Sequence, residues 1–382
     1  MDSQKEFSLR QAVLLGNPGT KRTDYFEQAA AFAKLPVLFV NWSGLDAWMQ
    51  QAGGREWFLK IDPPLWQSCC LGELENLAES YRKQLDTLAH AAGKYQITFF
   101  NHPDSIKRLL DKRACKKKLQ KAGLAVTQLL EKAVPQEPAA GWMQDKNQES
   151  CGQQETGTGK SESMQKLHTA GELLELMQES GVYQVFLKPV YGSGAAGVSA
   201  LRWHPAKNRM VLYTCALEHP KHGLVNTKKL RCFTGRDEIM SLLESILQMD
   251  CVAERWHAKA QHQGYSYDLR AVVLDGSVEF LLGRLSRGPV TNLHLNNHPL
   301  SADELQIPPA VRAQIEELCA RAAGCYPGLR CAGIDILLER GSLQPRIIEM
   351  NAQGDLIYQD IFHENRIYRR QAQIMAEWIK RA

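Results

Sequence analysis

The sequence lacks several features that would place it in other classes of protein. No stretch reaches the ~18 consecutive apolar residues of a membrane-spanning helix, and the polar start, MDSQKEFSLRQAVLLGN, does not resemble a signal peptide. Ten cysteines are present without the close pairs of zinc sites, and the tightest groups are Cys69-Cys70 and Cys319, Cys325 and Cys331. We therefore expect a cytoplasmic protein with reduced thiols and no membrane partner.

The chain also lacks a strong excess of either charge. Its 46 Lys and Arg against 42 Asp and Glu give a net charge of +4, which does not by itself indicate nucleic acid. The densest basic run, Lys112, Arg113, Lys116, Lys117 and Lys118, contains no interleaved aromatic residues, so a nucleic-acid partner is not expected. A solvated helix face accounts for this run except at Lys112.

The chain has 382 residues and is 44% hydrophobic, which is enough for two or three cores at roughly 100–200 residues each. The first hundred residues predict a parallel α/β unit, with strands at 12–16, 36–41 and 96–100 and a helix at 23–34. Residues 135–165 are poor in aliphatic side chains and predict a disordered insertion or long surface loop, with a docking tail as the alternative.

The second half of the chain is expected to be rich in β-structure. Helices are predicted at 104–122, 170–179, 309–323 and over most of 359–380. Between them, strands are expected from Tyr183 to about Leu295, followed by a hairpin at 333–351.

A glycine cluster between Phe186 and Trp203 matches the dinucleotide fingerprint in form, as Gly192-x-Gly194-x-x-Gly197. That fingerprint requires a strand before it and a helix after it. Here residues 198–203 alternate with period two and 210–217 predict another strand, so the glycines are expected to cap a β-hairpin. Such a loop brings backbone N–H groups close to phosphate, and Lys188 adds a charge. The alternative is a tight turn with a surface lysine.

The predicted hairpin at 333–351 carries a second set of polar residues. Pairing Glu339 with Pro345 across the five-residue turn puts Asp335 opposite Glu349, with Asn351 on the same face. Two facing carboxylates repel, and a hard cation such as Mg²⁺ removes that cost. The opposite face then carries Ile334, Ile336, Ile348 and Met350. The alternative is a solvated acidic face of a sheet.

Two further strands carry charged residues. Asp268 and Arg270 point outward from a strand that ends at Asp275-Gly276, and the returning strand leads into Arg284. Both arginines are candidates for binding phosphate or a substrate carboxylate. The stretch Cys251–Trp256 is a short strand with a polar exit at Glu254 and Arg255, for which a plain edge strand is the alternative.

Taken in order, these motifs resemble the ATP-grasp superfamily, and most closely its carboxylate–amine ligases of the ribosomal-protein glutamate ligase and glutathione synthetase type. The resemblance covers most of the chain from about Asn101 to residue 354. It implies an α/β (α+β) ATP-grasp fold with a parallel pre-ATP-grasp domain, a small lid subdomain and a C-terminal antiparallel-sheet subdomain with flanking helices. The corresponding boundaries are 1–103, 104–254 including the insertion, and 255–382.

The resemblance also implies roles for individual residues. Lys188, and with less support Lys112, would contact nucleotide phosphate, while the glycine loop would cover the phosphates and the strand end at 254–256 would form the adenine hinge. Asn351 would complete a metal site, although Met350 and the ending Ala352-Gln353 depart from the usual pattern. The implied nucleotide-binding residues are Lys112, Lys188, Gly192, Ser193, Gly194, Gly197, Glu254, Arg255, Trp256, Asp268 and Asn292; the catalytic ones are Lys188, Arg270 and Arg284; and the metal ligands are Asp335, Glu349 and Asn351.

The chemistry that the resemblance implies is amide-bond formation. ATP, with Mg²⁺ or Mn²⁺, would activate a small-molecule or peptide carboxylate as an acyl phosphate, which an amine substrate then attacks. One alternative is a phosphotransferase on the same scaffold, and another is a nucleotide-binding module that binds a peptide partner without turnover. A homodimer is left open.

The N-terminal unit is expected to carry much of the acceptor site. Arg22, Asn17 and His102 lie near predicted strand ends, where ligands of α/β sheets bind, although turn and capping roles explain each of them singly. Four tryptophans also fall in this region, and packing in the core explains them better than a peptide groove: Trp42, Trp48, Trp57 and Trp66.

Overall fold

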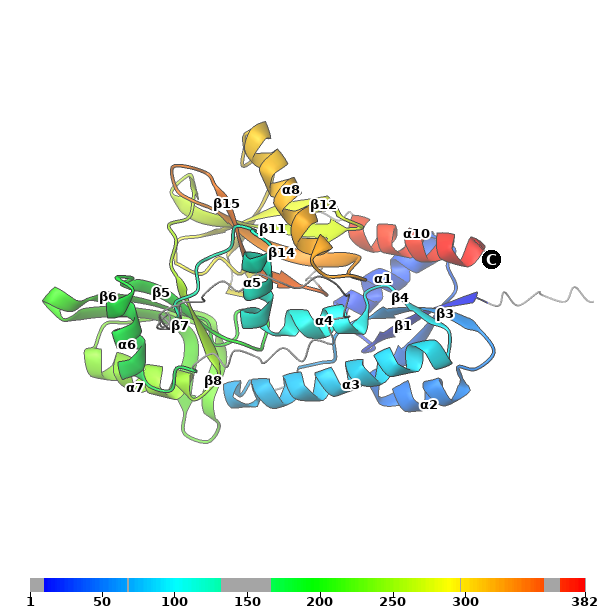
Figure 1. Cartoon of the computed structure of the whole chain (residues 1–382), viewed down its shortest axis with the longest axis horizontal. Helices are drawn as coiled ribbons and strands as arrows, with labels where there is room; N and C mark the ends of the chain where they lie inside the picture. Colours follow the sequence, from blue (N-terminus) through cyan, green and yellow to red (C-terminus); the bar gives the residue numbers. More distant parts are fainter. Residues whose placement is uncertain (1–9, 67–68, 132–165, 296, 354–364, 382) are drawn as a thin grey trace, which may run out of the picture.

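The computed structural model describes residues 10–66, 69–131, 166–295, 297–353 and 365–381. Three β-sheets are arranged along the molecule, with a four-stranded sheet at one end, a five-stranded sheet at the other and a six-stranded sheet between and above them (Figure 1). The predicted insertion at 135–165 lies outside the described residues, as does the start of the predicted helix at 359–380.

The N-terminal sheet is parallel, as predicted. Its strands are β1 (Arg10–Gly16), β2 (Val37–Asn41), β3 (Glu56–Ile61) and β4 (Ile97–Phe99), in the order β2-β1-β3-β4. Strand β1 reads as a continuous apolar run because both faces of a parallel sheet are covered by helices. The connecting helices are α1 (Lys21–Phe32), α2 (Leu45–Gln51) and α3 (Leu74–Lys94), with short 3₁₀ turns η1 (Trp42–Gly44) and η2 (Leu71–Glu73).

The five-stranded sheet is antiparallel and has the order β8-β7-β6-β5-β9. Two helices, α6 (Ala170–Glu179) and α7 (Arg236–Leu247), bury their apolar faces against it and form a separate core. We call this unit the lid. Its strands are β5 (Gln184–Pro189), β6 (Ser199–His204), β7 (Arg209–His219), β8 (Gly223–Phe233) and β9 (Cys251–Arg255), with the 3₁₀ turn η3 (Pro205–Lys207).

The third sheet is also antiparallel, with the order β13-β12-β11-β14-β15 and β10 paired to β11. Helix α8 (Pro309–Gly324) covers one face and confirms the prediction at 309–323. The strands are β10 (Gln261–His262), β11 (Tyr265–Leu274), β12 (Ser277–Ser286), β13 (His298–Ser301), β14 (Cys331–Leu338) and β15 (Pro345–Asn351), with the 3₁₀ turn η4 (Leu293–Leu295).

The helix predicted at 104–122 is two helices, α4 (Pro103–Leu110) and α5 (Lys112–Lys121). Asp111 separates them because its backbone is extended and its carboxylate accepts a hydrogen bond from the N–H of Ala114, as an N-cap does. This break starts a new helix at Lys112. The lysine therefore lies in the first turn of α5.

The hairpin of β14 and β15 pairs in a register that the sequence predicts only in part. Leu338, not Glu339, lies opposite Pro345, but a bulge between Asp335 and Ile336 restores the predicted pairing of Asp335 with Glu349. The extra residue is on β15, and it turns Ile348 to the side that lines the main cavity. The prediction that Ile348 lies on the core face is therefore wrong; Ile347 is buried there instead.

The last helix packs beside the first. Helix α10 (Arg366–Lys380) contacts α1 and the first sheet, where Tyr368 contacts Phe26 and Tyr25, and its core also includes residues of β11 and β14. Val126, earlier in the chain, pairs with Ile347 of β15. The chain thus returns to its first unit and ties the two ends together (Figure 1).

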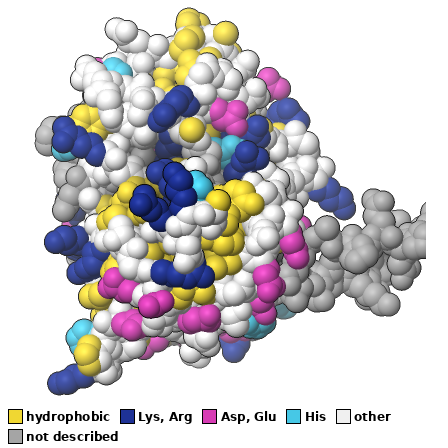
Figure 2. All heavy atoms as spheres, turned by 90° about the vertical axis from the view of Figure 1, so that its left-hand side faces the viewer, with side chains coloured by type: hydrophobic (Ala, Val, Ile, Leu, Met, Phe, Trp, Pro, Cys, Tyr) yellow, Lys and Arg dark blue, Asp and Glu magenta, His cyan; other side chains and the backbone are white. Residues whose placement is uncertain are grey.

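The described residues also bear on membrane-spanning helices and on disulfides. Over the part of the chain that the structure describes, no helix combines the length and apolar character needed to cross a bilayer. No disulfide links the cysteines within the same part. On the end of the molecule that carries the lid, the described side chains include basic, acidic and hydrophobic groups, and no continuous basic stripe runs across that face (Figure 2).

Candidate active site

The main cavity lies where the lid, helix α5 and the C-terminal sheet meet, and has a volume of about 270 Å³. Seven of its lining residues are Lys or Arg and four are Asp or Glu, which leaves an excess of three positive charges. A cation-rich cavity of this kind attracts polyanions such as a nucleoside triphosphate. The cations are Arg22, Lys112, Lys188, Arg255, Lys259, Arg270 and Arg284, and the anions are Glu254, Asp268, Asp335 and Glu349.

The glycine cluster forms the loop of a β-hairpin, as predicted, because β5 and β6 pair on either side of it. Gly192, Ser193 and Gly194 line the cavity, and Gly192 and Gly194 have positive φ angles of 117° and 66°. Gly197 lies at the base of the loop instead, where an added Cβ would lie 2.8 Å from Cγ of Pro189. The helix that a dinucleotide fingerprint requires is therefore excluded.

Replacing Gly197 by Ala is expected to destabilise the hairpin. Its φ of +67° alone costs about 1–2 kcal/mol for an L-residue, and the contact with Pro189 adds about 1–3 kcal/mol of overpacking. Gly223→Ala is the matched control, since Gly223 has a φ of +65° and nothing within 4 Å of its Cβ position. Urea unfolding should show the larger loss for Gly197→Ala, and equal losses would contradict the packing argument.

Lys188 belongs to a buried cluster with Glu254 and Lys116. Its Nζ lies 2.8 Å from Oε2 of Glu254, and Nζ of Lys116 lies 2.6 Å from Oε1 of the same carboxylate. The hydroxyl of Thr127 donates a third hydrogen bond to Glu254. Burial alone would raise the pKa of Glu254, but the two lysines lower it to about 2, so the carboxylate stays ionised. One carboxylate against two lysines leaves one positive charge in the cluster.

Lys116 is the member of this buried cluster that the sequence analysis missed. The prediction of a solvated helix face is wrong at this residue, because the side chain is 4% exposed. It is also wrong at Arg113, whose guanidinium pairs with both carboxylate oxygens of Asp250. The signal available in the sequence was spacing: Lys116 follows Lys112 by four residues and so lies on the same helix face. Nζ of Lys112 donates to the carbonyl of Gly192 and lies 3.8 Å from Oε1 of Glu349.

The attraction of this cluster for a phosphate group is expected to weaken as the pH rises through about 8. Burial lowers the pKa of Lys116 to about 8, so above that pH the lysine loses its proton. The cluster with Lys188 and Glu254 then falls from one positive charge to none, and its attraction for phosphate decreases. Between pH 7 and 9 the Kd for ADP should rise about threefold to tenfold in calorimetry. Lys116→Met should bind equally at both values, and an unchanged pH dependence in that variant would contradict this account.

The two N–H groups of the strand end predicted as an adenine hinge are hydrogen-bonded within the chain. The N–H of Arg255 donates to the carbonyl of Gln128, and the N–H of Trp256 donates to the carbonyl of Gln184. Neither backbone group is open to a base in this structure. Among the described residues, the next N–H along the chain with no hydrogen bond is that of His257, which also lines the cavity.

Asp268, Arg270 and Arg284 form a buried ion-pair network and do not project outward as expected. Nε of Arg284 lies 2.7 Å from Oδ1 of Asp268, and its Nη2 lies 3.1 Å from Oδ2 of Asp335. Nε of Arg270 lies 2.7 Å from Oδ1 of Asp335. Burial alone would raise the pKa of Asp268, but Arg284 and Lys259 lower it to about 2. The network fixes Asp335 in place.

Lys259 and Thr291 complete this network and were not singled out in the sequence. Nζ of Lys259 lies 3.3 Å from Oδ2 of Asp268 and donates to the hydroxyl of Thr291 at 2.7 Å. Thr291 in turn donates to Asp268. Neither residue lies in a recognisable motif, because Lys259 follows β9 and Thr291 follows β12, and only the folded chain brings them together.

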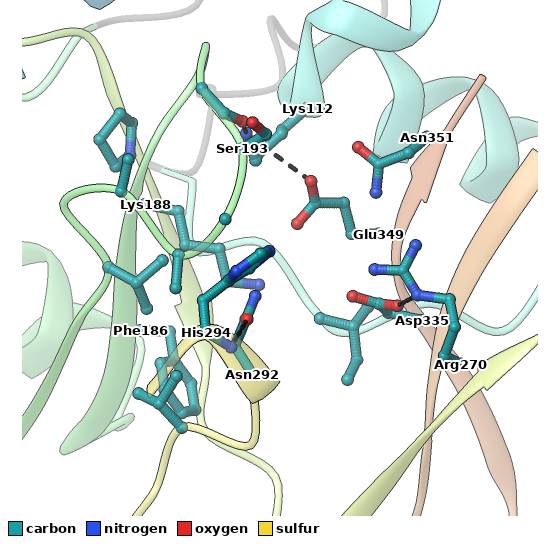
Figure 3. Close-up of a pocket in the computed structure, with 18 of the residues that line it drawn as sticks. Lys112, Phe186, Lys188, Ser193, Arg270, Asn292, His294, Asp335, Glu349 and Asn351 are labelled. Carbon is teal, nitrogen blue, oxygen red and sulfur yellow. Dashed lines mark hydrogen bonds and ion pairs between the residues drawn. The ribbon is translucent and has the colours of Figure 1, made fainter. Parts of the chain in front are cut away.

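The predicted metal ligands lie on one face of the hairpin β14–β15. Asp335 and Glu349 are directly opposite each other, and the side chains of Asp335, Glu349 and Asn351 extend toward the same space, facing the loop that carries Ser193 (Figure 3). Oδ1 of Asp335 is buried and has no hydrogen bond of good geometry among the described residues, despite its close ion pair with Arg270. The same residues provide no hydrogen bond to the amide of Asn351. This donor set of oxygens fits Mg²⁺.

The predicted metal ligands are two carboxylates and one amide, which is fewer charged ligands than a metal site built from protein side chains alone. In the described part of the chain, no three or more His, Cys, Asp or Glu side chains are grouped to hold a metal ion. Magnesium bound beside phosphates needs only one or two protein carboxylates, because phosphate oxygens and water supply the other ligands.

Comparison with solved structures places this arrangement in a known fold. The chain resembles D-cycloserine synthetase DcsG with a TM-score of 0.56 and 11% identity over 96% of this chain and 99% of that one. It resembles ATP-grasp ligase PsnB, solved with a minimal precursor, Mg and ADP, with a TM-score of 0.52 and 12% identity over 97% and 98% of the two chains. The chain has the ATP-grasp fold.

A third similar structure is macrocyclase MdnC bound with precursor peptide MdnA from Microcystis aeruginosa, with a TM-score of 0.56 and 10% identity over 96% of this chain and all of that one. The sequence matches no protein-family model and no curated protein. The ATP-grasp resemblance seen in the motifs is thus confirmed at the level of the fold.

In this ATP-grasp fold the segment after β12 closes one side of the cavity. Asn292 lines the cavity, and its side-chain oxygen accepts from the N–H of His294 at 2.9 Å, which starts η4. His294 lies beside the glycine loop, 3.6 Å from the position of a Cβ on Gly194 (Figure 3). His294 therefore joins the predicted Asn292 at the mouth of the cavity.

Of the three N-terminal candidates for the acceptor site, one lines the cavity and two make structural hydrogen bonds. Arg22 lines the cavity and donates to the carbonyl of Gln353. Asn17 instead donates to the carbonyl of Pro63, in the segment after β3, and His102 caps the start of α4. Trp42, Trp48 and Trp57 are core residues, as expected, whereas Trp66 is partly buried and lines the cavity.

Proposed function

We propose that this protein is an ATP- and Mg²⁺-dependent ligase that joins a carboxylate to an amine. The observation that carries the proposal is the cation-rich cavity in which the glycine hairpin faces the Asp335–Glu349 pair. A triphosphate lying between them would meet backbone N–H groups and lysines on one side and a divalent ion on the other. The ATP-grasp fold supports the proposal.

The residues of the chain would act mainly by positioning charge. Lys188 and Lys112 would neutralise phosphate oxygens, with the N–H groups of the loop around Ser193. Glu254 and Lys116 would hold Lys188 in place, and Arg270 and Arg284 would hold Asp335 toward the metal site while presenting positive charge to the reacting groups. Mg²⁺ held by Asp335, Glu349 and Asn351 would supply charge stabilisation on the transferring phosphoryl group.

The reaction proceeds in two displacements. A carboxylate oxygen of the first substrate forms a bond to the γ-phosphorus while the bond to the β-phosphate oxygen breaks, which gives an acyl phosphate and ADP. The nitrogen of the amine then bonds to the acyl carbon, phosphate leaves, and the amine gives up a proton. Closure of the hairpin over the cavity would keep water from the acyl phosphate.

The test is a screen for ADP release with amino acids and peptides supplied as pairs of carboxylate and amine. The proposal predicts ADP only when a carboxylate is present, and a hydroxamate when hydroxylamine replaces the amine. A phosphotransferase on the same scaffold would instead give a stable phosphorylated product that hydroxylamine does not trap. A binding module without turnover would bind ATP and release no ADP. Either result would refute the ligase.

Peptide carboxylates and amines belong in the screen. Two proteins of similar fold were solved with precursor peptides, PsnB with a minimal precursor and MdnC with MdnA. For the proposed ligase, either a peptide or a small molecule can supply the carboxylate or the amine. The screen distinguishes these two kinds of substrate by testing each amino acid both free and within a short peptide.

A further inference from the structure

The chain just before helix α3, together with its first residue, packs against the lid. We call residues 69–74 the docking segment. By their place in the chain they belong to the first unit, yet Leu71 and Leu74 are part of the hydrophobic core of the lid. Their side chains are 1% and 9% exposed. Figure 1 shows the start of α3 beside β8, so the first unit and the lid share a buried contact.

Backbone hydrogen bonds fix the register of this contact. Cys70 forms an antiparallel bridge with Val225 of β8. The N–H of Asn226 donates to the carbonyl of Cys69 at 2.8 Å. The docking segment is therefore attached to the lid at defined residues, and its two leucines reach defined positions in the core.

These leucines contact the two ends of the glycine loop, residues 190–198. A Cβ added to Gly192 would lie 3.2 Å from Cδ1 of Leu74 and 3.4 Å from its Cδ2. A Cβ added to Gly197 would lie 3.5 Å from Cδ1 of Leu71. The docking segment thus packs directly against the backbone of the loop at both glycines.

Hydrogen bonds hold the same two glycines from other directions. The N–H of Gly197 donates to Oδ1 of Asn226 at 3.2 Å, and Asn226 is the residue that bonds to the docking segment. The carbonyl of Gly192 accepts from Nζ of Lys112. Removing the leucines would leave these polar contacts in place but take away the packing that limits where the loop can move.

Helix α3 carries this contact back into the first unit. Leu85 and Leu88, further along the same helix, are fully buried in the core that includes the first sheet. One helix thus has its first residue in the core of the lid and its later residues in the core of the first unit.

We propose that the docking segment holds the glycine loop in the position that binds the terminal phosphates, with Leu71 and Leu74 as positioning residues. This inference rests on the proposed function, in which the loop shields the acyl phosphate formed from the γ-phosphate. The loop then needs a fixed position at that end of the triphosphate, because backbone N–H groups stabilise charge only when they are already oriented. The first unit supplies that fixed position.

Amide hydrogen exchange tests the contact without any nucleotide. Leu74→Ala should speed exchange of the amides in residues 190–198 at least about threefold, because local opening of the loop becomes easier. Leu88→Ala is the matched control, since it removes the same atoms from a buried position of the same helix. It should lower stability by a comparable amount and leave exchange in the loop unchanged.

Nucleotide binding tests the position of the loop. The full chain and its variants are titrated in a calorimeter with AMPPNP or with AMP, each in the presence of Mg²⁺. Leu74→Ala should raise the Kd for AMPPNP about tenfold, whereas the Kd for AMP, which lacks the β- and γ-phosphates, should stay within about twofold. Leu74→Met, which keeps the size and apolar character of the side chain, should bind both nucleotides like the unmodified protein.

A polar variant gives a second measurement that does not depend on a core substitution. Asn226→Ala removes the acceptor for the N–H of Gly197 but keeps the backbone bond to Cys69. It should raise the Kd for AMPPNP about threefold and leave that for AMP unchanged. Thr227→Ala is its control, because the hydroxyl of this neighbouring residue on β8 donates to the carbonyl of Cys215 and not to the loop.

The outcomes separate this inference from the proposed function. Selective loss of AMPPNP binding in Leu74→Ala and Asn226→Ala, without ADP release from any substrate pair, would keep the docking segment and refute the ligase. Equal losses for AMPPNP and AMP in Leu74→Ala would overturn the inference. So would the same selective loss in Leu88→Ala, because general destabilisation would then explain it. ADP release by Leu74→Ala at the unmodified rate, with unchanged exchange in the loop, would keep the ligase and overturn the inference.

Discussion

Glu349→Gln is expected to lower ADP release by about 10²–10³-fold at fixed Mg²⁺. The substitution keeps the size of the side chain but removes one of the two carboxylates that face each other across β14 and β15. It also removes the charge that lies 3.8 Å from Lys112. The loss should be partly recovered at high Mg²⁺, because a weaker metal site fills only at higher concentration. The measurement is ADP release as a function of Mg²⁺ concentration, with the substrate pair found in the screen.

The matched control is Asp275→Asn, in the turn between β11 and β12. Asp275 also pairs with a cation, Arg330, but it is 41% exposed and does not line the cavity. Its variant should keep the Mg²⁺ dependence and the rate of the unmodified protein. Turnover of Glu349→Gln at the rate of this control would remove the metal assignment.

Arg284→Met should produce the second large effect, a loss of about 3–5 kcal/mol in the free energy of unfolding. Arg284 is 2% exposed and lies between the carboxylates of Asp268 and Asp335. Removing its charge leaves Asp268 with Lys259 and Thr291, and Asp335 with Arg270. Each carboxylate keeps one cation but loses its contact with the guanidinium of Arg284 in a buried position, which is costly even though the methionine packs well.

Urea unfolding measures this loss, and Arg312→Met is the control. Arg312, on α8, pairs with Asp303 and Glu316, but its side chain is 43% exposed, so its loss should cost about 0–1 kcal/mol. If Arg284→Met lost as little free energy of unfolding as Arg312→Met, buried charge would not be what stabilises the network around Asp335.

Local patterns in the sequence predicted the strands around the glycine loop and the facing acids, but not α2, β3 or α3 of the first unit. The strands around the glycine loop were predictable because period-two alternation on both sides excludes a helix after Gly197. The pairing of Asp335 with Glu349 was also predicted, but for an incomplete reason. The turn register is displaced by one residue, and a bulge of β15 compensates for it. A bulge has no signal in the residues 345–351 themselves, so the position of Ile348 could not be predicted.

The burial of Lys116 and Lys259 could not be predicted from local pattern. Their partners, Glu254 and Asp268, come from strands β9 and β11. A lysine side chain is rarely buried unless the fold places a carboxylate beside it. The hydrogen bonds at the predicted adenine hinge could not be predicted for a similar reason. The amides of Arg255 and Trp256 are used by residues 128 and 184, which are far from them in the chain. The residue types of the candidate site could thus be identified in the sequence, whereas their hydrogen-bond and ion-pair partners are determined by the tertiary fold.

A crystal structure of the protein with ADP and Mn²⁺, collected at the manganese absorption edge, tests the central claim most directly. The account predicts an anomalous peak within about 2.5 Å of oxygens from Asp335 and Glu349 and of the ADP phosphates. The phosphates should lie under the hairpin that carries Gly192, Ser193 and Gly194. Manganese bound elsewhere on the chain, or ADP bound outside this cavity, would contradict it.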